Sequence, residues 1–314
     1  MLLFPAFVEM TLLWLIASRR QFLFDSSSSS SAAATTLIVS ANDDTSLCQK
    51  NGILTEERAI PGAYENVCMT LPIRTIAVDD DDDDDDSTIL SIEQQASGPG
   101  ATGLAVWNSS LLLTRLLPLL SFRDTTVVEL GCGTGLASLV AAMMGAKRVF
   151  ATDGNPNVIK LAERNIQRNN MQNVVKAVSY QWGYDTDPIP EESADWVIGS
   201  DLTYSPGSWP LLADAMASLV KPNTGIILYL SLGHPGFNVQ GEINGFLSVA
   251  QSRSLRPLLL SDSEWPLRTS DGTPLAPEAY LRASCRNGYE RTILESGGGT
   301  RVLFLQKRMQ RRYS

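Results

Sequence analysis

One short stretch, residues 127–135, constrains the fold of this 314-residue chain more than any other. It reads Val-Val-Glu-Leu-Gly-Cys-Gly-Thr-Gly, an apolar run with one acidic residue and then glycine at every second position. Such an apolar run is typical of a strand buried in a parallel sheet. Gly131, Gly133 and Gly135 permit a tight turn and let a ligand approach the backbone closely. Because a helix-like segment follows, the stretch predicts the strand, turn and helix of a doubly wound α/β fold.

The glycine spacing also indicates the kind of ligand. A G-x-G-x-G turn differs from the G-x-G-x-x-G of dinucleotide-binding loops, in which a pyrophosphate lies at the helix N-terminus. Residues 131–135 contain no Lys or Arg that would favour a phosphate. A nucleotide-like cofactor without a phosphate therefore fits better, and S-adenosylmethionine is such a cofactor.

Two acidic residues flank this turn in the predicted sheet. A strand over residues 147–152 is followed by Asp153. In doubly wound sheets, a carboxylate at that position can accept hydrogen bonds from both hydroxyls of a ribose. Glu129 precedes the turn, and two roles are open for it. Its charge can meet the α-ammonium group of the cofactor, or it can cap nearby backbone amides.

The rest of the chain alternates between helical and strand patterns. Helices are predicted over residues 109–120, 136–144, 155–169, 208–220 and 239–250, and strands over residues 174–180, 195–200, 225–230 and 302–306. Pro118 is expected to disturb the first helix near its end. Because ligand-contacting loops follow the carboxyl ends of parallel strands, we expect Trp182, Asp201 and Tyr204 at one rim of the sheet.

Residues 69–78 and 88–94 alternate between apolar and polar side chains, which predicts a β-hairpin. An unbroken run of aspartates, residues 79–86, lies at its tip. This run is either a solvated, self-repelling loop or a site for calcium or a basic partner. The folded domain is expected over residues 47–314, with an insertion at about residues 252–299 that is rich in Ser, Pro and charge.

Residues 1–46 are expected to lie outside the folded domain. Residues 2–17 are largely apolar, but they include Glu9, lack a preceding positive region and are short for a bilayer span. The serines and alanines of residues 26–34 offer too little apolar area to offset the entropy of ordering. The segment is therefore either a targeting peptide or low-complexity sequence.

Charge and cysteine content limit the environment and the partners. The formal net charge is −9, and subtracting the eight charges of the aspartate run leaves about −1 for the rest of the chain. A nearly neutral folded part offers no basic field for nucleic acid. The four cysteines show neither metal-ligand spacing nor a dense disulfide pattern, so we expect reduced thiols and a cytoplasmic protein.

Several motifs together resemble one enzyme family. They are the predicted hairpin, a G-x-x-V-W segment that ends at Trp107, the glycine turn, the Ala-Thr-Asp that ends at Asp153, and the Asp-Leu-Thr-Tyr of residues 201–204. This set resembles the seven-strand class I methyltransferases. The D-x-x-Y motif with the upstream Trp narrows the resemblance to the protein-lysine methyltransferases of methyltransferase family 16, related to methyltransferase-like 21. The resemblance covers about residues 69–232, with a weaker stretch at about 300–307.

The resemblance implies a Rossmann-like seven-strand methyltransferase sheet with an N-terminal β-hairpin extension. It implies methyl transfer from S-adenosylmethionine to a lysine side-chain amine of a protein, with Asp201 and Tyr204 as catalytic residues. The residues expected to bind the cofactor are Trp107, Glu129, Gly131, Gly133, Gly135, Asp153, Trp182 and Ser200. No metal is expected. We expect a monomer that acts on a protein and has no nucleic-acid or membrane partner.

The chemistry of the D-x-x-Y motif has two interpretations. Asp201 can accept a hydrogen bond from a lysine ammonium and help to orient the amine. Tyr204, Trp209 and Tyr229 can then form an aromatic wall that favours a cationic aliphatic amine. Alternatively, Asp201 is a helix cap and Tyr204 is a core ring.

Three other aromatic or titratable residues also have two interpretations. Trp107 is either a core residue or a wall of the cofactor site. Trp182 either stacks on adenine or covers the core. His234 is the one histidine of the sequence, so a Ser-His-Asp hydrolase would need it as the base. It belongs either to such a relay or to a loop near the site.

Two further function classes stay open. The first is an N-methyltransferase that acts on a small amine or a nitrogen heterocycle through the same pocket. The second is a protein that keeps the fold but serves as a binding module. The intact glycines, Asp153 and the D-x-x-Y motif argue against the binding module, because a decayed site has no physical reason to keep them all.

Overall fold

A computed structural model of the chain describes residues 46–50, 53–57, 73–77, 89–95, 102–184, 189–232, 238–285, 294 and 299–309. Residues 1–45, the aspartate run of residues 79–86 and His234 lie outside the described residues, so the predictions made for them are not tested here. Among the described residues, no helix has the length and apolar character that crossing a membrane requires.

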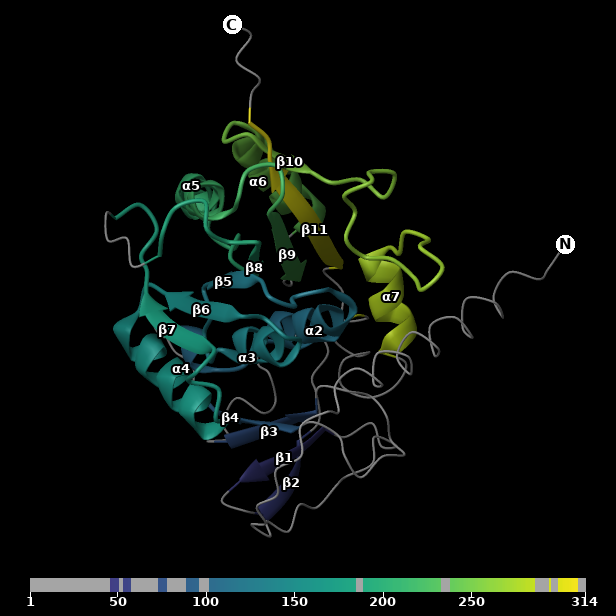
Figure 1. The fold of residues 1–314 in the computed structure, drawn as a ribbon. Helices are drawn as coiled ribbons and strands as arrows, with labels where there is room; N and C mark the ends of the chain where they lie inside the picture. The colour runs from purple at the N-terminus through teal and green to yellow at the C-terminus, as the bar shows by residue number, and fades with distance from the viewer. Residues whose placement is uncertain are drawn as a thin grey trace, which may run out of the picture.

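The described part of the chain is built on a seven-stranded sheet with the order β10-β11-β9-β8-β5-β6-β7 (Figure 1). Its strands are β5 (Thr126–Leu130), β6 (Arg148–Asp153), β7 (Val175–Ser179), β8 (Trp196–Ser200), β9 (Ile226–Leu232), β10 (Leu255–Pro257) and β11 (Thr300–Lys307). The pairs from β7 across to β9 are parallel, whereas β11 pairs antiparallel with both β9 and β10. The predicted Rossmann-like seven-strand sheet is confirmed.

The strand order places the ligand-binding edge. From β5 the chain proceeds outward through β6 to β7, and it then returns to β8 on the other side of β5. The order therefore reverses between β5 and β8. In open α/β sheets, the crevice at such a reversal lies at the carboxyl ends of the strands and is where ligands bind.

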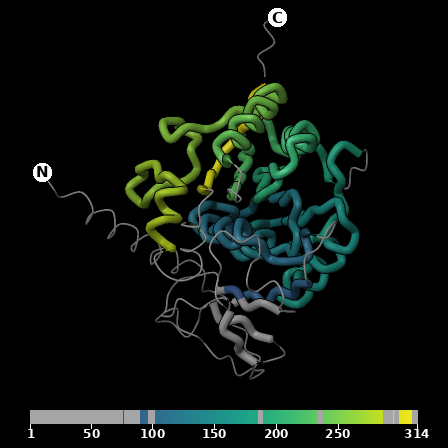
Figure 2. Tube along the Cα trace, turned by 180° about the vertical axis from the view of Figure 1, so that it is seen from behind, coloured from purple at the N-terminus to yellow at the C-terminus, as the bar shows by residue number. Residues whose placement is uncertain are grey.

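Helices cover both faces of the sheet (Figures 1 and 2). One apolar cluster joins one face to α2 (Asn108–Leu116), α3 (Leu136–Met143), α4 (Pro156–Arg168) and α7 (Pro277–Ser284). A second cluster joins the other face to α5 (Trp209–Leu219) and α6 (Val239–Gln251). Helix α2 ends at Leu116 and a 3-10 turn over Leu117–Leu119 contains Pro118, as predicted, because proline cannot donate the next helical hydrogen bond.

The predicted hairpin is also confirmed. Strands β3 (Ile73–Ala77) and β4 (Ile89–Glu93) pair antiparallel, with Ile73 opposite Glu93 and Ala77 opposite Ile89. Buried Leu90 and Ile92 join the apolar cluster that contains α2 and α3. The hairpin is therefore anchored to the helical layer beside the sheet. A second antiparallel pair, β1 (Ser46–Lys50) with β2 (Ile53–Glu57), was not predicted from the sequence.

Within its described residues, the segment expected to be an insertion, residues 252–299, contains strand β10 and helix α7, which the sequence did not predict. Strand β10 forms an edge of the seven-stranded sheet, and α7 packs in the same apolar cluster as α2. Leu255 and Leu281 are both fully buried. Part of this segment is therefore integral to the central fold.

Candidate functional site

The glycine turn, residues 131–135, lies between the carboxyl end of β5 and the start of α3. Gly131 and Gly133 have φ values of +61° and +54°, in the left-handed region that disfavours side chains. A Cβ at Gly131 would overlap the Leu202 Cδ2 methyl group, and a Cβ at Gly133 would lie 3.2 Å from the Gly103 carbonyl oxygen. The predicted tight turn is confirmed, and glycine is needed at both positions.

Asp153 faces this turn from the end of β6. Its Oδ1 accepts a hydrogen bond from the Asn155 amide at 2.9 Å, and its Oδ2 accepts one from the Gly133 amide at 3.4 Å. Burial raises the pKa of Asp153, although the residue is only half-buried by exposed area. The structure therefore brings the predicted carboxylate against the glycine turn, at the reversal of the strand order.

Glu129 takes the second of the two roles that the sequence left open. Its Oε2 accepts hydrogen bonds from the Ser138 amide, at 2.9 Å, and from the Ser138 hydroxyl, so it satisfies a backbone amide in the first turn of α3. Burial raises the pKa of Glu129 to about 7. A contact with the ammonium group of a cofactor stays a prediction.

The second half of the site is the 201–204 loop, which follows β8. Asp201 has φ +50°, its amide donates to the Leu230 carbonyl at 2.9 Å, and its Oδ1 accepts from the Leu232 amide at 2.7 Å. Helix α5 begins later, with Ser208 at its N-cap. Asp201 therefore does not cap α5 but ties the loop to the end of β9. Tyr204 is 59% exposed, so the interpretation of a helix cap followed by a core ring is wrong.

Tyr229 does not belong to the predicted aromatic wall. Its ring is fully buried beneath the 201–204 loop, and its hydroxyl oxygen accepts hydrogen bonds from the amides of Leu202, at 2.9 Å, and Thr203, at 3.0 Å. Burial raises the pKa of Tyr229, so it stays a neutral phenol. The sequence pattern of an aromatic residue in a strand could not show which side of the loop its ring would occupy.

A directed chain of hydrogen bonds holds the loop from below. Because the Tyr229 oxygen accepts from two amides, its own hydrogen is available to the Thr203 Oγ1, 2.8 Å away. The Thr203 hydroxyl in turn donates to Glu242 Oε1 on α6, and the Ser231 hydroxyl donates to the same oxygen at 3.2 Å. The chain of hydrogen bonds ends at the Glu242 carboxylate, which accepts both of these bonds. Sequence reasoning missed Thr203 and Glu242, which lie 39 residues apart and share no local motif.

Trp209 supports the same loop from α5. Its Nε1 donates to the Thr203 carbonyl at 2.8 Å, and its ring packs on α6 so closely that a Cβ at Gly245 would clash with it. The ring is half-buried against the apolar cluster of α5 and α6. Trp209 therefore holds the loop in place, and only Tyr204 of the three predicted wall residues is largely exposed.

The remaining predicted residues lie at or near the same rim. Trp107 precedes α2, is half-buried, and donates from Nε1 to the Thr102 carbonyl at 2.6 Å. Trp182 follows β7 and packs against the α5 and α6 cluster while it stays partly exposed. Ser200 is the last residue of β8. Their contacts with a cofactor stay predictions.

Comparisons with known proteins find similarity to lysine methyltransferases. A family model described as lysine methyltransferase matches residues 84–234. Protein-lysine N-methyltransferase EFM3 of Chaetomium thermophilum is 32% identical over 155 residues, which cover 46% of this chain and 46% of that protein. EEF1A lysine methyltransferase 3 of Xenopus tropicalis is 29% identical over 144 residues, 45% of this chain and 63% of that protein. Protein N-lysine methyltransferase METTL21A of Danio rerio is 31% identical over 128 residues, 39% of this chain and 58% of that protein.

The chain thus spans between 46% and 63% of the length of these three relatives. The segment matched by the family model contains the glycine turn, Asp153 and the whole 201–204 loop. Over residues 84–234, the chain is therefore similar to the lysine methyltransferase family.

Proposed function

We propose that this protein transfers a methyl group from S-adenosylmethionine to a lysine side-chain amine of a protein substrate. The observation that carries the proposal is the direct contact between the two halves of the site. The side chain of Leu202, in the 201–204 loop, occupies the space beside Gly131 of the glycine turn. A cofactor held by the turn and an acceptor held by the loop would therefore meet at one place on the rim.

The residues at the glycine turn fit S-adenosylmethionine. The left-handed glycines expose backbone without side chains, and the turn carries no cation for a phosphate. Asp153 offers a half-buried carboxylate that can accept from ribose hydroxyls. Glu129, Trp107, Trp182 and Ser200 complete the proposed binding set. When bound, the cofactor supplies an activated methyl group attached to sulfur.

The proposed work of the protein is to orient the acceptor and to exclude water. Methyl transfer to an amine is an in-line displacement, so the nitrogen must be neutral, close and aligned. Asp201 can accept a hydrogen bond from the amine and orient its lone pair. The pre-organised loop keeps that carboxylate in position through the Leu232 amide. Exposed Tyr204 offers a ring face to the aliphatic stem of lysine.

An N-methyltransferase for small amines is the alternative function. The exposure of Tyr204, at 59%, favours the larger acceptor, because a site for a free small amine buries most of its ligand. The relatives named above are described as acting on protein lysines, which supports the same choice. A cytoplasmic, monomeric protein is part of the proposal. Its cytoplasmic part is supported by Cys132, which is buried and forms no disulfide.

The test is transfer of label from methyl-labelled S-adenosylmethionine to a cell extract, with the protein purified as the full chain. We expect label in protein that yields methyl-lysine on hydrolysis, and loss of this label in Asp153→Ala and Asp201→Ala. Asp214→Ala is the matched control, because this exposed carboxylate pairs with Arg253 on the surface of α5. Label found in small solutes would establish the alternative function, and no transfer to any fraction would contradict both.

A further inference from the structure

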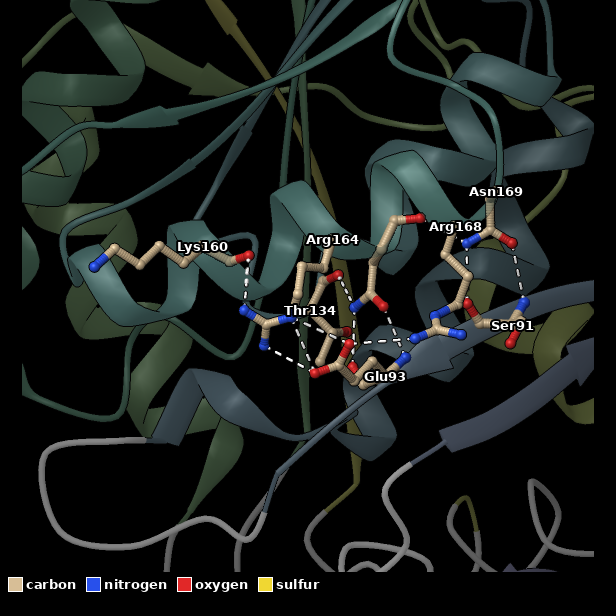
Figure 3. Close-up of polar contacts among 8 residues, drawn as sticks. Ser91, Glu93, Thr134, Lys160, Arg164, Arg168 and Asn169 are labelled. Atoms are coloured by element: carbon tan, nitrogen blue, oxygen red, sulfur yellow. Dashed lines mark hydrogen bonds and ion pairs between the residues drawn. The ribbon is translucent and has the colours of Figure 1, made fainter. Parts of the chain in front are cut away.

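Helix α4 holds the edge of the hairpin through the side chains of Asn165 and Asn169, and Figure 3 labels Asn169 beside Ser91. Asn169 Oδ1 accepts from the Ser91 amide at 3.0 Å, and its Nδ2 donates to the Ser91 carbonyl at 3.0 Å. Asn165 repeats the pattern on Glu93, with Oδ1 accepting from the amide at 2.7 Å and Nδ2 donating to the carbonyl at 2.9 Å. Each side-chain amide therefore makes the two hydrogen bonds that the backbone of a neighbouring strand would otherwise make with β4.

Helix and strand geometry make this match possible. Four residues of helix separate Asn165 from Asn169 and span about 6 Å, while two residues of strand separate Ser91 from Glu93 and span about 6.5 Å. Residues two apart in a strand also present their backbone groups to the same side. The edge of β4 is therefore satisfied by a helix, and the hairpin has a fixed position relative to α4.

Asn165 makes one contact that Asn169 does not. The second hydrogen of its Nδ2 is donated to the Thr134 carbonyl, inside the glycine turn, at 2.9 Å. The corresponding hydrogen of Asn169 goes to the Asn165 carbonyl within α4, at 2.8 Å. Asn165 is fully buried and uses its oxygen and both amide hydrogens. It therefore links the hairpin directly to the turn.

The chain that leaves the hairpin also reaches the turn. Gln94 Oε1 accepts from the Val106 amide at 3.1 Å, and the Gln95 amide donates to the Leu104 carbonyl at 2.8 Å. Between these points, Gly103 lies against Gly133, where a Cβ would be 3.2 Å from the Gly103 carbonyl oxygen. The glycine turn is thus held between Asn165 and the segment that follows β4.

The charged residues of this region contribute less to the position of the hairpin than the two asparagines do. Glu93 pairs with Arg164 at 2.8 Å and with Arg168 at 3.3 Å, and these hydrogen bonds lower the pKa of Glu93 (Figure 3). The arginine side chains are 44% and 37% exposed, and exposed ion pairs are weakened by water and salt. The buried amide of Asn165 is the contact that reaches the cofactor side.

We propose that Asn165 is a positioning residue for S-adenosylmethionine binding, which couples the docked hairpin to the conformation of the glycine turn. The inference rests on the proposed function, in that the turn is taken to bind this cofactor. The hairpin is then a support of the cofactor site as well as an extension of the sheet domain.

The test compares Asn165→Ala with Asn169→Ala in the full chain. Both variants lose a pair of hydrogen bonds to β4, so both are expected to melt at lower temperature. Only Asn165→Ala loses the bond to Thr134, so only it is expected to weaken S-adenosylmethionine binding, by about three- to tenfold in calorimetry, against less than twofold for Asn169→Ala. Equal affinities in the two variants would overturn the proposal.

Two further measurements separate the possible failures. Hydrogen exchange in the cofactor-free protein should accelerate at residues 133–135 in Asn165→Ala but not in Asn169→Ala, and equal exchange there would contradict the coupling. If Asn165→Ala does not fold, Asn165→Asp keeps the acceptor for the Glu93 amide and loses the donors to the Glu93 and Thr134 carbonyls, and the same comparison is made with Asn169→Asp. Asp153→Ala tests the cofactor site itself. If Asp153→Ala binds S-adenosylmethionine as tightly as the wild type, the proposed function is refuted. If Asp153→Ala binds it more weakly but the Asn165 and Asn169 variants have equal affinities, only this inference is refuted.

Discussion

Replacing Tyr229 with Phe removes one oxygen atom from beneath the 201–204 loop. The ring is fully buried and packs beside Phe246, with ring centroids 5.9 Å apart, so phenylalanine keeps the packing and opens little space. The lost oxygen is the acceptor for the amides of Leu202 and Thr203. Both amides would then be buried without a partner.

The expected energy follows from these two amides. A buried donor left without an acceptor costs about 1–3 kcal/mol, so Tyr229→Phe, which leaves two such donors, should lower the free energy of unfolding by about 2–6 kcal/mol. The left-handed backbone conformation of Asp201 costs about 1–3 kcal/mol, and the hydrogen bonds to Tyr229 help to keep the loop in this conformation. The loop is therefore expected to leave its position for part of the time.

Displacement of the loop should affect transfer more than cofactor binding. We expect the single-turnover rate of methyl transfer to fall about ten- to a hundredfold, because positioning contacts act on that scale. The affinity for S-adenosylmethionine should stay within about twofold, since the ribose is proposed to be held by Asp153. Denaturant unfolding, single-turnover transfer and calorimetry measure the three quantities.

Tyr184→Phe is the matched control, because this tyrosine is 63% exposed and its hydroxyl supports no loop amide in the described structure. It should change the free energy of unfolding by less than about 0.5 kcal/mol. If Tyr229→Phe is less stable but transfers methyl groups at the wild-type rate, the buried hydroxyl stabilises the fold without positioning the acceptor. A role of the Tyr229 hydroxyl in acceptor positioning would then be refuted.

Three other substitutions test the rest of the site. Gly131→Ala should lower the free energy of unfolding by about 1–3 kcal/mol through its left-handed backbone and the clash behind it, whereas Gly207→Ala, which has open space, should not; denaturant titration distinguishes them. Asp201→Ala should reduce single-turnover transfer at least about tenfold with cofactor affinity within a few-fold, and Asp201→Asn, which keeps the backbone contact, separates the charge from the positioning. Because burial raises the pKa of Glu129 from 4.5 to about 7, the unfolded protein releases this proton at lower pH, so stability should fall between about pH 4.5 and 7. Glu129→Gln should flatten that fall in pH-dependent unfolding, and an unchanged slope would contradict the assignment.

The sequence alone determined the elements whose signals are local. The glycine turn, the alternation of β3 and β4, and the amphipathic pattern of α4 each depend on residues within about fifteen positions of one another. Backbone conformation is a local property, so left-handed glycines and a proline that ends a helix can be read from the residue type. The position of Asp153 and Asp201 at strand ends followed for the same reason.

The tertiary structure decided which side chains support the site. The sequence predicted Tyr229 as part of the aromatic wall. A strand pattern shows on which face of the sheet a side chain lies, but it does not show which loop covers that side chain. Its contact with Thr203 joins residues 26 positions apart, and Glu242 lies 39 positions from Thr203. Strand β10, with only three residues, carries too short a pattern to be recognised until β11 provides its partner. Such contacts depend on strand order and on the packing of helices across the sheet, and no local pattern in a single sequence specifies them.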